Sequence, residues 1–124
     1  MSKDQVTMFP ETALKKARGK VEQSLAKAIS EEKDYACAGH PDYASQHEAY
    51  AVMLEELEET EINIKKLGKA VQEYWDAIKT NEASVIALKL PVIKEVAQSV
   101  ALEAIQVAAV TLKAIDAFEE QNSK

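Results

Sequence analysis

The sequence predicts an all-α protein, folded as an antiparallel bundle of about four helices. Alanine accounts for twenty of the 124 residues and hydrophobic residues for 47%, whereas glycine and proline number only three each. Apolar residues also recur at spacings of three and four along most of the chain, which is the period of one helix face. This combination favours closely packed helices over strands joined by tight turns. The length fits a single domain, residues 1–124.

The first helix is expected over residues 11–38, after a flexible N-terminus of residues 1–10. Apolar side chains repeat at helical spacing from Leu14 onward and form one stripe. Gly39 and Pro41 interrupt this pattern, so the helix should end before them.

A second helical segment is expected over residues 46–80, with Ser45 as its cap. It is long, and Gly68 lies in its interior. A glycine costs about 1 kcal/mol relative to alanine in a helix, which permits a bend or a short break there without forcing one. No heptad pattern is sustained well enough to predict a coiled coil.

Residues 82–120 should supply the third and fourth helical segments, and Asn81 can cap the third. Pro91 either kinks one long helix or occupies the first turn of the fourth. Both alternatives are open from the sequence. Residues 100–112 are apolar on nearly every side, which predicts a central helix surrounded by others.

Charge and composition exclude several classes of function. The net charge is −6 and Arg18 is the single arginine, so no dense basic surface exists for a nucleic-acid backbone. No apolar run of about 18 residues could cross a membrane, and the N-terminus lacks the regions of a signal peptide. Cys37 is the only cysteine, which excludes an intramolecular disulfide. A soluble, cytoplasmic protein without nucleic-acid or membrane partners is therefore expected.

The densest acidic run is MLEELEETE, residues 53–61. On a helix, Glu55, Glu56 and Glu59 cover an arc of roughly 100°, beside an apolar face. A solvated acidic surface explains such a run without any special role.

Glu103 is harder to explain in this way, because it interrupts the apolar stretch 101–112. An ionised carboxylate inside a bundle loses several kcal/mol of solvation unless another group replaces the water. Gln106, a lysine or a backbone donor could supply that group. If instead Glu103 faces the acidic helix, the carboxylates form a cluster of oxygen ligands suited to Mg²⁺.

These residues resemble the MazG-like all-α nucleotide pyrophosphohydrolases. The similarity covers LEELEE at 54–59, EAIQVAAV at 103–110 and the preceding HEAYAVM at 47–53. The family's E-E-x-x-E motif and its downstream E-x-x-D motif lie on separate helices and hold magnesium. Its members cleave nucleoside triphosphates to monophosphate and pyrophosphate, and they form homodimers or homotetramers.

The resemblance implies that Glu55, Glu56, Glu59 and Glu103 bind Mg²⁺, with Glu55 or Glu56 orienting or deprotonating the attacking water. Gln106 stands where the family has an aspartate, and a neutral amide is a weaker ligand for a hard cation. Two outcomes follow. The site keeps one metal and acts on a narrow or modified set of nucleoside triphosphates, or it has lost hydrolysis and retains binding.

The alternative function is a non-catalytic helical bundle, a phage or bacterial accessory or interaction protein with a degenerate metal site. Other side chains with possible roles in phosphate or base contact are Lys65, Lys66, Lys113, His47, Tyr50, Tyr74 and Trp75. Lysines on helices are commonly solvated and aromatics at helical spacing commonly fill a core, so none of these residues predicts a site by itself.

Overall fold

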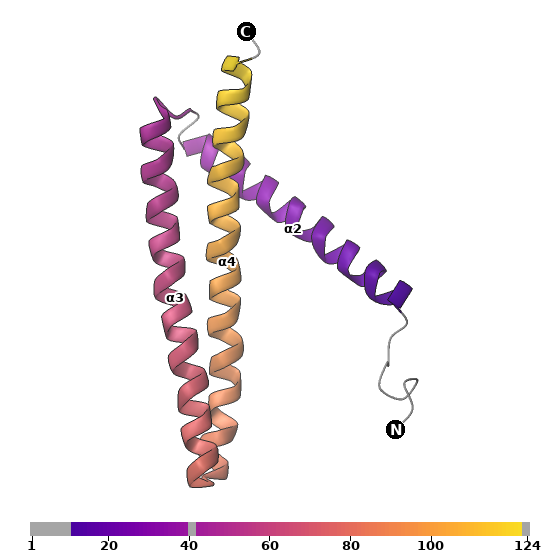
Figure 1. Ribbon diagram of the computed structural model, residues 1–124, viewed down its shortest axis with the longest axis vertical. Helices are drawn as coiled ribbons and strands as arrows, with labels where there is room; N and C mark the ends of the chain where they lie inside the picture. Colours follow the sequence, from indigo (N-terminus) through magenta and orange to yellow (C-terminus); the bar gives the residue numbers. More distant parts are fainter. Residues whose placement is uncertain (1–10, 40–41, 123–124) are drawn as a thin grey trace.

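The computed structural model describes residues 11–39 and 42–122, and this part of the chain is helical with no strand. Three helices follow one another: α2 (Glu11–Gly39), α3 (Gln46–Thr80) and α4 (Ala83–Asn122). Helices α3 and α4 form a long antiparallel hairpin, and α2 crosses α4 near one end of it (Figure 1). The all-helical prediction is confirmed. The described helices form a crossed hairpin, and a closed four-helix bundle is not present among them.

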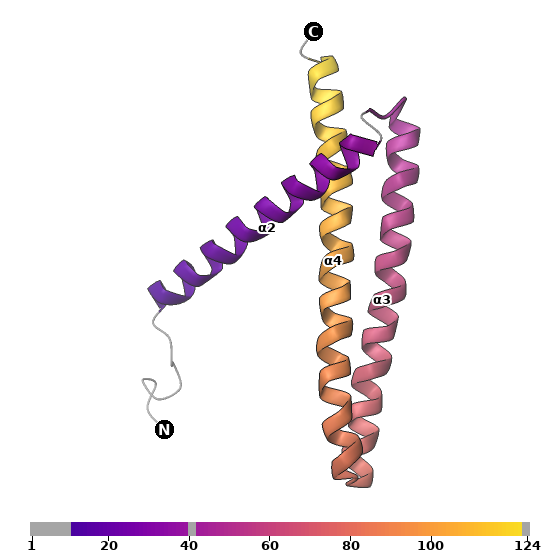
Figure 2. The same ribbon diagram turned by 180° about the vertical axis from the view of Figure 1, so that it is seen from behind.

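Helix α2 contacts the hairpin through its C-terminal part only. Lys33 forms an ion pair with Asp116 of α4. By contrast, residues 12–27 are exposed except for Gly19, and this part of the helix extends away from the hairpin in both views (Figures 1 and 2). The apolar stripe expected from Leu14 onward is therefore uncovered within one chain. Residues 1–10, expected to be flexible, lie outside the described residues.

Helix α3 has the bounds expected from the sequence, and its first turn shows why it begins there. The Ser45 hydroxyl accepts a hydrogen bond from the Glu48 backbone N–H at 3.2 Å. The Glu48 carboxylate in turn accepts one from the Ala44 N–H at 3.1 Å. These reciprocal bonds satisfy donors that a helix N-terminus leaves without partners. Gly68 lies inside the continuous helix and produces no break.

Asn81 ends α3 instead of capping α4. Its backbone adopts a left-handed conformation, with φ 56° and ψ 36°, and its N–H bonds the carbonyls of Ala77 and Ile78. Asparagine tolerates this conformation better than most residues with a side chain. The chain therefore reverses within two residues and α4 starts at Ala83.

Residues 83–122 form one helix that runs through Pro91. The two alternatives left open by the sequence are resolved in favour of a single long helix. A proline inside a helix loses one hydrogen bond and costs about 3 kcal/mol. Packing of α4 along α3 on both sides of Pro91, including the Lys89 to Glu73 ion pair at 2.8 Å, offsets that cost.

The hairpin is held by small residues at the line of contact between α3 and α4. The most buried apolar side chains besides Tyr43 and Val110 are alanines: Ala49, Ala70, Ala77, Ala109 and Ala114. Alanine lets the two helix backbones approach closely, which explains why so alanine-rich a chain forms a hairpin.

The prediction of a fully surrounded central helix needs correction. Helix α4 does contact both of the other described helices. However, Leu102, within the most apolar stretch, is 62% exposed, so one side of α4 is uncovered. The described residues supply only two other helices, which are too few to surround α4. Within the described residues, no helix is long and apolar enough to span a membrane.

Candidate metal centre

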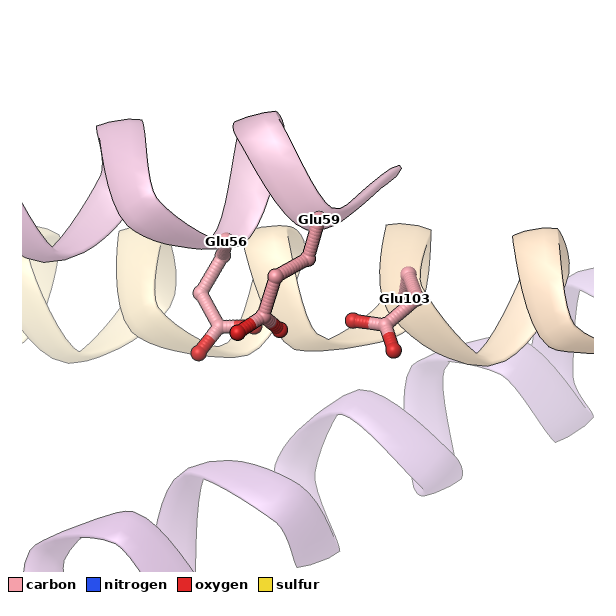
Figure 3. Close-up of side chains that lie close together, drawn as sticks. All are labelled: Glu56, Glu59 and Glu103. Carbon is pink, nitrogen blue, oxygen red and sulfur yellow. The ribbon is translucent and has the colours of Figure 1, made fainter. Parts of the chain in front are cut away.

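Three carboxylates from two helices meet on one side of the hairpin. Glu56 and Glu59 project from neighbouring turns of α3, because residues three apart share a helix face. Glu103 projects from the adjoining part of α4. One carboxylate oxygen from each lies within 4.8 Å of the other two. All three side chains point toward the side on which α2 passes (Figure 3).

Gln106, one turn beyond Glu103 on α4, links the two helices at this cluster. With its carboxamide nitrogen turned toward the carboxylates, it donates to Glu56 Oε2 at 3.0 Å and to Glu103 Oε2 at 3.1 Å. The opposite orientation would place an amide oxygen against two carboxylate oxygens, which is repulsive. A neutral donor therefore bridges the two helices at the position where the resemblance expects an aspartate.

The electrostatics of the cluster centre on Glu56. Its side chain is partly buried, and this desolvation raises its pKa above the ordinary value of 4.5. The negative charges of Glu59 and Glu103 raise the pKa of Glu56 further. Both effects disfavour the ionised form, and a cation bound between the carboxylates would relieve both.

The donor set fits a hard divalent cation. Mg²⁺ prefers oxygen ligands at about 2.0–2.1 Å, so two oxygens on opposite sides of one ion are about 4.1 Å apart. The largest oxygen separation in the cluster is within 4.8 Å, and small side-chain adjustments would close the difference. Three carboxylates would leave positions for waters and phosphate oxygens, which is how Mg²⁺ is commonly held.

Three of the four residues expected to bind metal are thus brought together, and Glu55 is not among them. Its side chain is exposed. At about 100° per residue, Glu55 lies about 40° beyond Glu59 on the side away from Glu56, so it lies at the outer edge of the acidic face. Its charge still contributes to the raised pKa of Glu56.

Two pockets lie on either side of Glu56, between α2 and the hairpin. The first has a volume of about 290 Å³ and is lined by Ala36, Tyr43, Glu48, Val52, Glu56, Val110 and Lys113. The second has a volume of about 260 Å³ and is lined by Glu32, Tyr35, Ala36, Glu56, Gln106, Ala109 and Val110. Of the three clustered carboxylates, Glu56 therefore borders concave surface, which a merely solvated acidic face would not require.

Lys113 gives the first pocket a positive charge. It is only 5% exposed, and its ammonium lies 4.2 Å from the centre of the Tyr43 ring. The Tyr43 hydroxyl donates to the Val110 carbonyl at 3.3 Å, and burial raises the pKa of Tyr43, which keeps this donor protonated. An ammonium over an aromatic face is electrostatically favourable.

Lys113 is among the phosphate contacts suggested by the sequence, and Tyr43 is not. The signal for Tyr43 was present, because an aromatic residue just before a helix cap often packs under the helix that follows. The other suggested contacts, namely Lys65, Lys66, His47, Tyr50, Tyr74 and Trp75, do not line either of these two pockets.

Comparisons with protein-family models, with curated proteins and with solved structures found no match to this chain. The likeness to the MazG-like enzymes therefore depends on the motifs at Glu55 to Glu59 and at Glu103.

Proposed function

We propose that the protein is a Mg²⁺-dependent nucleoside triphosphate pyrophosphohydrolase of the MazG-like type. The observation that carries the proposal is the meeting of Glu56, Glu59 and Glu103 from two helices within 4.8 Å. A bound cation stabilises carboxylates that repel one another at close range, and a divalent cation can join protein carboxylates to phosphates of the same sign.

In this proposal Glu56, Glu59 and Glu103 hold Mg²⁺, which supplies neutralisation of the triphosphate and acidification of a water molecule. Glu56 accepts the proton of the attacking water, because it belongs to the carboxylate cluster and also lines both adjoining pockets. Lys113 places positive charge in the adjoining pocket, where it attracts phosphate oxygens. Glu55 is the other glutamate suggested for proton transfer. It is exposed and lies outside the carboxylate cluster, so its side chain would have to move toward the cluster to act.

One observation favours a second candidate, the non-catalytic helical protein with a degenerate metal site. Gln106 donates to both Glu56 and Glu103. These hydrogen bonds stabilise the two carboxylates in part without a metal. In that case the cluster is a hydrogen-bonded link between α3 and α4, and Mg²⁺ binds weakly there or not at all.

The experiment is a pyrophosphate-release assay on canonical and modified nucleoside triphosphates with Mg²⁺, using the native chain, Glu56→Gln and Glu103→Gln. Glu95→Gln is the matched control, since Glu95 is exposed on α4 two turns before Glu103. The proposal expects turnover to fall at least about 100-fold in both cluster variants and to change little in the control.

Absence of turnover with every nucleotide would remove the enzymatic proposal. If Mg²⁺ then raises the thermal stability of the native chain but not that of Glu56→Gln, the site binds without hydrolysis. A Gln106→Asp variant separates the remaining cases: appearance of activity would show that hydrolysis was lost through this residue.

A further inference from the structure

An apolar stripe runs along α3 beside the face that contacts α4. It consists of Leu54, Leu57, Ile64, Val71, Trp75 and Ile78, which are between 37% and 52% exposed. These positions follow spacings of three and four from residue 54 to residue 78, interrupted only by Glu61 and Gly68. Such spacing is the seam of a helix that packs along another helix.

This stripe is distinct from the contact with α4. The residues of α3 buried in the hairpin are Ala49, Thr60, Ala70 and Ala77. At 100° per residue, the stripe lies about 100° around the helix from them, and Glu59 of the acidic cluster lies about 150° from the stripe. A partner on the stripe would therefore leave the candidate metal centre uncovered.

The accessible surface of a single chain is larger than that of a compact protein of the same mass. The accessible surface is 9624 Å². A compact protein of the same mass, 13.7 kDa, has an accessible surface of about 6,600 Å². The difference of about 3,000 Å² exceeds the roughly 800 Å² that each partner buries in a standard interface.

We propose that the stripe is covered by α3 of a second copy of this chain, in antiparallel orientation about a two-fold axis near residue 66. This pairing places Leu54 against Ile78 of the second copy and Leu57 against its Trp75. It also places Ile64 against Gly68, where a side chain would meet no atom within 4 Å in the single chain. The large side chain then occupies the space that glycine leaves.

Charge selects the antiparallel orientation. Residues 54–61 contain five glutamates and no basic residue, whereas residues 65–79 contain four lysines, one glutamate and one aspartate. An antiparallel pair sets the acidic half of each helix against the basic half of the other, and Glu58 lies on the same edge as Lys79 of the second copy. A parallel pair would set acidic against acidic and Glu61 against itself. A lone polar residue at such a position also fixes the register.

The resemblance implies a homodimer or homotetramer, and this pairing specifies the surface that would join two copies. Its test uses neither magnesium nor nucleotide. A failure here therefore leaves the proposed enzymatic function untouched, and a failure of that function leaves the pairing untouched.

The first test is disulfide trapping in a Cys37→Ala background, which removes the only native cysteine. The double variant Leu54→Cys with Ile78→Cys should form a covalent dimer under mild oxidation. Neither single variant should, because identical positions lie about 36 Å apart in the antiparallel pair. Efficient cross-linking of a single variant, or none in the double variant, would overturn the pairing.

The second test is sedimentation equilibrium of the full chain. The native protein should have twice the 13.7 kDa chain mass, and Leu57→Glu with Trp75→Glu should weaken the dimer about 100-fold or more. Ile62→Glu is the matched control, because Ile62 is also an exposed apolar residue of α3 but lies off the stripe. Circular dichroism checks that each variant remains helical. A monomeric native chain, or equal dissociation by Ile62→Glu, would contradict the proposal.

Discussion

Two sides of α3 differ in the kind of side chain that each leaves without a partner: one carries clustered negative charge, and the other carries exposed apolar side chains. The side facing α2 carries Glu56 and Glu59 beside Glu103, with pockets next to Glu56. The opposite side carries an exposed apolar stripe from Leu54 to Ile78. The first arrangement is relieved by a cation and the second by burial against another apolar surface. Helix α3 thus contributes both to the candidate metal centre and to the apolar stripe. Packing against α4 fixes the orientation of both.

The orientation of both surfaces of α3 depends first on the tight packing at the start of this helix. Ala49 is 1% exposed and lies with Tyr43 and Ala114 in the core cluster. Ala49→Leu should overpack this contact and lower the free energy of unfolding by about 1–3 kcal/mol. Urea unfolding measures the change. Ala51→Leu, at an exposed position of the same turn, should change stability little, and an equal loss in both variants would show that Ala49 is not tightly packed.

A second experiment determines which glutamates on the side facing α2 belong to the metal site. Glu59 belongs to the carboxylate cluster and Glu55 does not, although both are exposed. Glu59→Gln should weaken Mg²⁺ binding by about tenfold or more, which is about 1.4 kcal/mol, whereas Glu55→Gln should change it by less than about twofold. Calorimetric titration with Mg²⁺ measures both. Equal losses would extend the site to Glu55, as the motif resemblance implies.

A third prediction concerns the cap that starts α3 and so fixes the rotation of both surfaces. Ser45→Ala removes the acceptor for the Glu48 N–H and should cost about 1 kcal/mol. Thermal unfolding measures this, and Ser45→Asp should restore most of the loss because aspartate supplies an equivalent acceptor. If Ser45→Asp behaves like alanine, the cap is not what stabilises this end.

The smallest effect is the pH dependence contributed by Glu56. Its pKa is raised in the folded chain, so its stabilising contribution is full below the ordinary value of 4.5 and is lost as pH rises through the raised pKa. Without Mg²⁺, Glu56→Gln should therefore unfold at a higher temperature than the native chain, and this difference should grow as pH rises from 4 toward neutrality. Calorimetric scans across pH test this. If the difference in unfolding temperature shrinks as pH rises, the pKa of Glu56 is not raised in the folded chain.

Local features of the fold were predictable from the sequence. Ser45 marked the start of α3, and the apolar periodicity between residues 46 and 80 marked its length, because caps and helix period are local properties. Pro91 could not be assigned from the sequence, since its effect depends on packing of α4 on α3. The exposure of Leu102 was also missed, because the apolar stretch around it gives no information on how many helices surround it.

The candidate site was predictable in part for the same reason. The spacing of Glu56 and Glu59 showed that they share a helix face, and the apolar surroundings of Glu103 indicated that it needs a partner. Which of the neighbouring glutamates meets Glu103 depends on the rotation of α3 against α4, which the sequence does not contain. The position of Tyr43 under Lys113 likewise depends on the path of the connection between α2 and α3.

The measurement that tests the central claim most directly is calorimetric titration of Mg²⁺ into the native chain and into Glu56→Gln, without nucleotide. The account predicts saturable binding to the native chain that weakens at least about tenfold in the variant. Equal binding by the two proteins, or no binding by the native chain, would contradict the proposal that carboxylates from α3 and α4 form a cation site.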